Sequence, residues 1–180
     1  MATRDRETAL IVEVPAAEPV VGRHRADLDA NAGLGVPAHI TILAPFVPAG
    51  RLGAPERDRL AGVFAAVLPF ELRLDRTCWF GTTVLWLGPR DPAPFSDLTG
   101  RVFAAFPEYP PFGGQFDEVV PHLTVGHQRP VDELRRAEQE IIPKLPVAAT
   151  VSAVTLMAES TVGGRWVTVA TFPLGSAGAR

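Results

Sequence analysis

Two short segments of the same form decide the fold of this chain: His-Ile-Thr-Ile at residues 39–42 and His-Leu-Thr-Val at residues 122–125. Each segment begins with a histidine, has a threonine two positions later, and fills the other two positions with apolar residues. Successive side chains of a β-strand point to opposite faces, so the histidine and threonine share one face. The spacing predicts two strands that each bury an apolar face and present an imidazole and a hydroxyl outward.

The elements expected around these segments follow the same order in both halves of the chain. In the first half, apolar periodicity and breaking prolines and glycines predict helices at 19–32 and 54–68 and strands at 37–46, 70–80 and 82–87. In the second half, they predict helices at 95–106 and 131–142 and strands at 119–125, 147–157 and 165–172. Trp86 and Val169, in the last strand of each half, are as far apart in sequence as the two motif histidines. The shared order indicates an internal repeat.

The repeat predicts an α+β, bilobal, duplicated fold. We expect residues 1–180 to form a single bilobal domain, with lobe repeats at about 19–88 and 95–173 and an N-terminal strand at 8–14. Each lobe would contain its own mostly antiparallel sheet, because tight turns join its last two strands. A pseudo-twofold axis would relate the lobes, with helices on the outside and an active cleft between them. His24, in the polar helix at 19–32, is expected at the surface.

Composition restricts the class of protein further. The chain has 180 residues, 47% of them hydrophobic, which is enough for a core without a disulfide or a metal. Its net charge of -3 provides no general positive field for long duplex nucleic acid. The single cysteine, Cys78, excludes an intramolecular disulfide and a multi-cysteine zinc site, and it fits a reducing compartment. No signal peptide or membrane span is readable, so we expect a cytoplasmic monomer without a membrane partner.

Two imidazoles and two hydroxyls in one cleft suit the hydrolysis of a phosphodiester. A neutral imidazole can take a proton from attacking water while a protonated one gives a proton to the leaving alkoxide. His39 and His122 can serve both roles because an ordinary histidine pKa of about 6.5 makes both forms accessible. Thr41 and Thr124 can donate hydrogen bonds to the non-bridging oxygens. On the residues alone, the alternative is that each histidine merely lies on an edge strand beside a β-forming threonine.

Other chemistries have weaker support in the sequence. His39, His122 and His127 are suitable metal ligands, but no carboxylate is spaced with them, so we expect no metal. The sequence contains no glycine-rich loop of the GxxxxGKS type, which argues against hydrolysis of nucleoside triphosphates. We therefore expect the protein to work without a cofactor.

The paired segments and their setting resemble the two-histidine phosphoesterases, also called the RNA 2',5'-ligase or LigT-like superfamily. The resemblance extends over nearly the whole chain, because residues 83–88 (TVLWLG) and 166–174 are similar to the closing strands of that family's lobes. It implies a bilobal α+β fold and metal-independent chemistry on 2',3'-cyclic phosphates or related 2',5' linkages. It also implies that the motif histidines are the acid/base pair and that the motif threonines bind phosphate.

One position departs from the family pattern. Several relatives place an arginine five residues after the second motif histidine, where this chain has His127. We expect His127 to offer an N–H to the substrate phosphate. Strand parity, however, would put it on the apolar face with Leu123 and Val125 unless Gly126 introduces a bulge.

The expected function is therefore hydrolysis of a 2',3'-cyclic phosphate, or a related cyclic phosphodiester, on a nucleotide or an RNA end. Two alternatives remain open. One is reversible 2',5' joining of tRNA halves at the same site, and the other is a nucleotide- or RNA-binding module without turnover. The acidic charge balance favours the small substrate.

Overall fold

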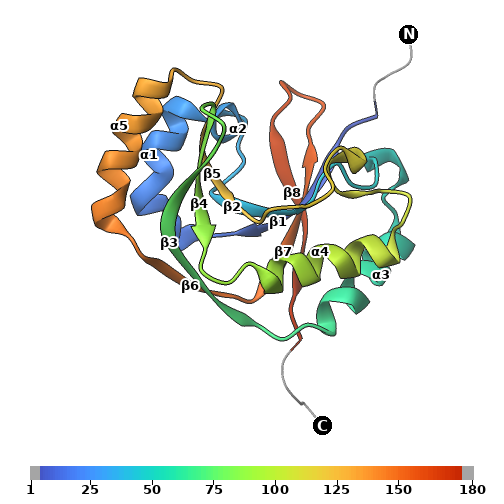
Figure 1. Ribbon diagram of the computed structural model, residues 1–180. Helices are drawn as coiled ribbons and strands as arrows, with labels where there is room; N and C mark the ends of the chain where they lie inside the picture. Colours follow the sequence, from blue (N-terminus) through green and yellow to red (C-terminus); the bar gives the residue numbers. More distant parts are fainter. Residues whose placement is uncertain (1–4, 176–180) are drawn as a thin grey trace.

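The computed structural model describes residues 5–175, which contain two four-stranded sheets (Figure 1). Sheet A has the strand order β2-β1-β7-β8 and sheet B the order β5-β4-β3-β6, and all pairings between these strands are antiparallel. Sheet A consists of β1 (Thr8–Glu13), β2 (His39–Leu43), β7 (Ala153–Glu159) and β8 (Trp166–Pro173). Sheet B consists of β3 (Phe70–Phe80), β4 (Val84–Pro89), β5 (Leu123–His127) and β6 (Val147–Val151). The expected bilobal α+β architecture is confirmed.

Two pairs of helices cover the sheets (Figure 1). Sheet B packs against α1 (Glu18–Leu28) and α5 (Val131–Ile141), and sheet A packs against α3 (Ala54–Ala65) and α4 (Ala93–Ala105). The shorter helices are α2 (Ala30–Gly33) and the 3-10 turns Pro15–Ala17, Ala49–Arg51, Pro111–Gly114 and Ile142–Lys144. α5 buries Leu134, Ala137 and Ile141, which recur at helical spacing on one face. None of the helices within residues 5–175 has the length and apolar character that crossing a membrane requires.

The two motif strands have the alternation that their spacing predicts. Ile40 and Ile42 of β2 are buried in the core, while His39 and Thr41 are half-buried on the other face. In β5, Leu123 and Val125 are buried and Thr124 is half-buried. Burial of the branched apolar side chains therefore fixes the face on which each histidine and threonine lies.

The expectation that each half of the sequence builds its own sheet is wrong. Sheet A joins β1 and β2 from the first half to β7 and β8 from the second, and sheet B likewise takes strands from both halves. The expected strand at 147–157 is interrupted at Ser152: β6 pairs with β3 in sheet B, whereas β7 pairs with β1 in sheet A. The repeats at about 19–88 and 95–173 thus exchange strands, and the chain passes between the sheets at Ser152.

The expected helix at 19–32 is also interrupted, at Asp29. This residue has an extended backbone, and its carboxylate accepts a hydrogen bond from the N–H of Asn31 at 3.1 Å, which caps α2. His24 is buried rather than at the surface, with Nε2 3.5 Å from Glu140 Oε2. Packing of α1 against α5 covers its ring.

Candidate active site

His39 and His122 lie where the edges of the two sheets meet. β2 is an edge strand of sheet A, β5 is an edge strand of sheet B, and these two strands contact each other. His39 is the first residue of β2, and His122 directly precedes β5. Both side chains are half-buried. The topology thus brings together two motif strands that are distant in the sequence.

The two imidazoles are held by the same kind of contact. Nδ1 of His39 lies 2.7 Å from the carbonyl oxygen of Pro37, and Nδ1 of His122 lies 2.7 Å from that of Val120. A carbonyl oxygen can only accept, so Nδ1 carries the hydrogen in both rings. Nε2 is therefore the nitrogen that gains or loses a proton. In the neutral ring it can act as a base, and in the charged ring as an acid.

Burial favours the neutral form of both rings. The pKa of His39 is lowered to about 4, mainly by desolvation. The hydrogen bond to Pro37 raises this pKa, and the positive charge of Arg25 lowers it. Electrostatic repulsion from His122 lowers the pKa of His39 further. Desolvation also lowers the pKa of His122, opposed by the hydrogen bond to Val120. The larger decrease keeps His39 neutral over a wider pH range than His122.

A polar network at α1 holds the segment that leads into β2. Glu18 Oε1 accepts a hydrogen bond from the Ala38 N–H at 2.7 Å. Arg25 Nη2 donates to the Val36 carbonyl at 3.1 Å and to Asp29 Oδ2 at 2.9 Å. Arg25 and Asp29 are both buried. These residues were not predicted from the sequence, because mixed charges like those around α1 are typical of a solvated helix face. The four-residue spacing of Arg25 and Asp29 was the feature of the sequence that could have indicated an ion pair between them.

The motif threonines lie beside different surfaces. Thr41 pairs across the sheet with Ile11 of β1, which packs in a small apolar cluster with Met157. Thr124 pairs with Trp86 of β4. Cross-strand partners lie on the same face of a sheet, so the hydroxyl on sheet A has an aliphatic neighbour and the hydroxyl on sheet B an aromatic one.

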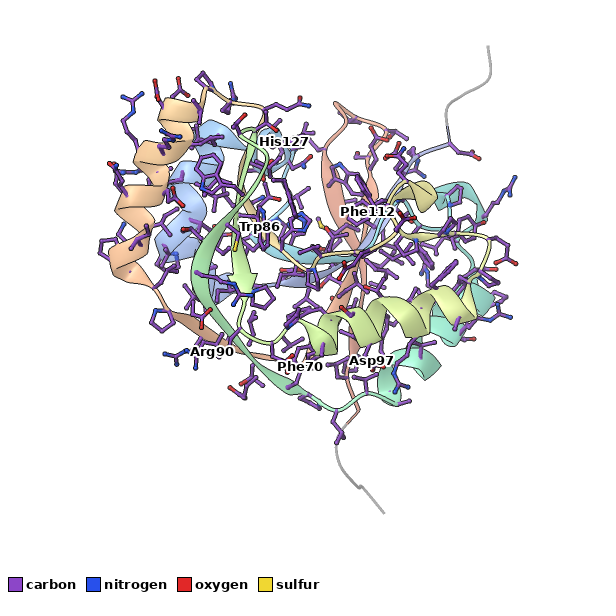
Figure 2. The ribbon with its side chains drawn as sticks, in the orientation of Figure 1. Phe70, Trp86, Arg90, Asp97, Phe112 and His127 are labelled. Carbon is purple, nitrogen blue, oxygen red and sulfur yellow. The ribbon has the colours of Figure 1, made fainter. Side chains whose placement is uncertain are left out.

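The aromatic surface beside Thr124 also supports His122. The Phe80 ring stacks on Trp86 with centroids 4.7 Å apart, and it forms a T-shaped contact with the His122 ring, with centroids 5.0 Å apart. The Trp86 and His122 rings are 5.8 Å apart. Figure 2 shows Trp86 near the middle of the molecule. Its indole N–H is buried and has no hydrogen-bond partner within residues 5–175. The site therefore contains one unused donor next to the second histidine.

A bulge changes the position expected for His127. Trp86 pairs with Thr124, but Leu85 pairs with Gly126, so Val125 is the extra, unpaired residue of a β-bulge. Gly126 takes the core-facing position, where an added Cβ would lie 2.4 Å from a methyl group of Leu134. His127 consequently lies on the face of Thr124 and is exposed, at the end of β5 near the tip of the β3–β4 hairpin (Figure 2). The bulge, at Val125 rather than Gly126, reverses the strand parity.

The arrangement has the groups that acid/base chemistry at phosphorus requires. In or directly before each motif strand lies an imidazole whose Nε2 has no hydrogen-bond partner within residues 5–175, and the accompanying hydroxyls can donate to phosphate oxygens. Within residues 5–175, no three His, Cys, Asp or Glu side chains are grouped so that they could hold a metal ion.

Comparisons with solved structures find the same fold. The chain is similar to LigT of E. coli complexed with NADP+, with 20% identity, a TM-score of 0.61, and coverage of 97% of this chain and 100% of that one. It is also similar to E. coli LigT complexed with 3'-AMP, with 19% identity, a TM-score of 0.59, and coverage of 95% of this chain and 99% of that one. A third similar structure is TT0787 of Thermus thermophilus, with 19% identity, a TM-score of 0.61, and coverage of 95% of this chain and 100% of that one. At these identities the likeness concerns the fold.

Sequence comparison identifies the family. No curated protein matches the chain. A family model described as the 2'-5' RNA ligase superfamily matches residues 12–163, a range that includes both histidine motifs, all of sheet B, and β2 and β7 of sheet A. The chain therefore belongs to the 2'-5' RNA ligase superfamily.

Proposed function

We propose that this protein is a phosphoesterase that opens 2',3'-cyclic phosphates, or related cyclic phosphodiesters, on nucleotides or RNA ends. The observation that carries the proposal is the contact between β2 and β5, each with a half-buried histidine whose Nδ1 is bound by a carbonyl two residues earlier. Family membership supports phosphoester chemistry. The LigT structures with 3'-AMP and NADP+ support a nucleotide ligand.

In the proposed reaction, His39 is the base and His122 the acid. Water attacks phosphorus as Nε2 of neutral His39 takes its proton, and a new P–O bond forms. The P–O bond to one ribose oxygen breaks on the opposite side, and that oxygen receives the proton from Nε2 of charged His122. Proton exchange with solvent then restores both rings. The anionic substrate favours the charged form of His122, which burial alone disfavours.

Hydrogen-bond donors complete the proposed site. Thr41 and Thr124 donate to the non-bridging oxygens, where negative charge concentrates in the transition state. His127, exposed on the face of Thr124, offers an N–H to the phosphate in place of the arginine of several relatives. Because the two imidazoles supply both proton transfers, the proposed reaction needs neither a metal nor a cofactor.

A panel of cyclic phosphates tests the proposal directly. We expect the protein to hydrolyse at least one nucleoside 2',3'-cyclic phosphate, with the same rate in the presence and absence of EDTA. Product formation is measured by chromatography. Joining of tRNA halves without hydrolysis would favour a ligase, and tight binding of a nucleoside 2'-phosphate without any turnover would favour a binding module. A rate abolished by EDTA would contradict the two-histidine mechanism.

The pH dependence of kcat/KM should follow from the lowered histidine pKa values. The free protein needs one neutral and one charged imidazole, and both pKa values lie below 6.5. We therefore expect a bell-shaped profile with its maximum between pH 4 and 6.5, falling about tenfold per pH unit on the alkaline side. Rates in buffers of constant ionic strength measure this. An activity that rises between pH 7 and 9 would exclude the assigned acid.

A further inference from the structure

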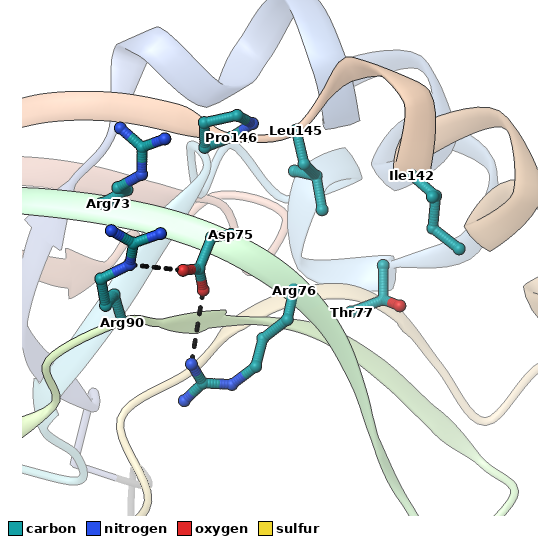
Figure 3. A pocket seen from close by; sticks show the side chains of 8 residues that line it. All are labelled: Arg73, Asp75, Arg76, Thr77, Arg90, Ile142, Leu145 and Pro146. Atoms are coloured by element: carbon teal, nitrogen blue, oxygen red, sulfur yellow. Dashed lines mark hydrogen bonds and ion pairs between the residues drawn. The ribbon is translucent and has the colours of Figure 1, made fainter.

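A cationic pocket lies at the outer edge of sheet B, where β3 continues beyond its pairing with β6 (Figure 3). Its volume is about 480 Å³. One wall has three arginines, namely Arg73, Arg76 and Arg90, around Asp75. The pocket is also lined by three apolar residues from the segment between α5 and β6, namely Ile142, Leu145 and Pro146. The pocket thus combines a charged lining with an apolar one.

The charges in this pocket do not balance. Asp75 accepts hydrogen bonds from Arg90 Nε at 2.7 Å and from Arg76 Nη1 at 3.4 Å. The hydrogen bond from Arg90 lowers the pKa of Asp75, which keeps the carboxylate ionised and the arginines oriented. Three guanidinium groups and one carboxylate leave an excess of positive charge in a chain whose net charge is -3. Guanidinium groups match the geometry of a phosphate, so the pocket suits an anionic ligand.

Arg76 connects this pocket with the candidate active site. Its side chain crosses Gly88 of β4, where an added Cβ would lie 3.0 Å from Arg76 Nε. The residue before Gly88 is Leu87, which pairs with Leu123, the residue after His122. Arg76 therefore extends over the strand position that neighbours the second histidine.

We propose that the pocket binds the phosphate attached to the 5' oxygen of the nucleotide whose cyclic phosphate lies at His39 and His122. The substrate is then an RNA 3' end, because the chain continues from a terminal 2',3'-cyclic nucleotide through that 5' phosphodiester. The apolar lining, where Ile142 is 53% exposed, covers the ribose and base of the preceding nucleotide. This inference rests on the proposed function and specifies its substrate.

Binding measurements separate this inference from catalysis. A trinucleotide and a nucleoside, both ending in a linear 2'-phosphate, are titrated against the whole protein at several salt concentrations. We expect the trinucleotide to bind at least about tenfold more tightly. Its logarithmic salt slope should be steeper by about 0.7, because the pocket neutralises one additional phosphate. R73Q combined with R90Q should abolish that advantage and leave nucleoside binding unchanged. D75N should strengthen trinucleotide binding, because it removes the opposing charge.

A matched surface arginine provides the control. Arg101 on α4 is 48% exposed and is paired with Asp97 at 2.7 Å, as Arg90 is with Asp75, but it does not line the pocket. R101Q should leave both affinities unchanged. Equal binding of the two ligands to the wild-type protein, or an unchanged preference in R73Q/R90Q, would overturn the inference. Failure of the wild type to hydrolyse any cyclic phosphate would instead refute the proposed function, since binding is measured without turnover.

Discussion

Replacing His39 by alanine is expected to lower kcat/KM for a nucleoside 2',3'-cyclic phosphate by roughly 10³-fold, and replacing His122 by alanine should cost a similar factor. Each substitution removes the Nε2 that takes or gives a proton in the proposed reaction. The two residues act on one transition state, so the double variant should be only slightly slower than either single variant. Initial rates measured below KM give these values.

His24, the other histidine in the first half of the chain, is the control for this prediction. It lies where α1 packs against α5, with Nε2 3.5 Å from Glu140 Oε2. His24→Gln keeps a polar group at that position and should leave kcat/KM unchanged. Circular dichroism and urea unfolding must show that all variants remain folded. If either alanine variant retains activity within a factor of about ten of the wild type, that histidine has no acid/base role.

The alternation of each motif could be predicted from the sequence because it is local. A strand has a period of two, so the apolar residues at 40 and 42 suffice to place His39 and Thr41 on the opposite face. The same rule placed Thr124 correctly. It failed for His127, because the bulge at Val125 adds one residue to β5 relative to β4. That bulge depends on the space between Gly126 and α5, which no periodicity within the strand reveals.

The exchange of strands between the halves could not be predicted from local sequence patterns. The segment at 147–157 is continuously strand-like, and only its partners show that β6 belongs to sheet B and β7 to sheet A. Likewise, a helix with alternating charges predicts solvent exposure, yet Arg25 and Asp29 are buried because the segment before β2 folds back over them. Contacts between elements distant in sequence decided both features.

The buried pair Arg25 and Asp29 yields the largest expected effect on stability. Replacing Arg25 by methionine would leave the Asp29 carboxylate and the Val36 carbonyl without their shared donor in a buried region. We expect the free energy of unfolding to fall by about 3 kcal/mol or more, measured by urea denaturation. The loss of its positive charge should also raise the pKa of His39 and move the acid limb of the kcat/KM profile to higher pH.

Two comparisons distinguish burial from simple loss of an ion pair. Arg101 and Asp97 on α4 have the same i,i+4 spacing and a contact of 2.7 Å, but their side chains are 48% and 54% exposed, against 3% for each member of the buried pair. Arg101→Met should therefore cost less than about 0.5 kcal/mol. Combining Arg25→Met with Asp29→Leu should recover part of the lost stability, because no unpaired charge remains buried. If Arg25→Met and Arg101→Met were equally mild, the network would not hold the segment before His39, and the position of that imidazole would have to depend on the β1–β2 pairing alone.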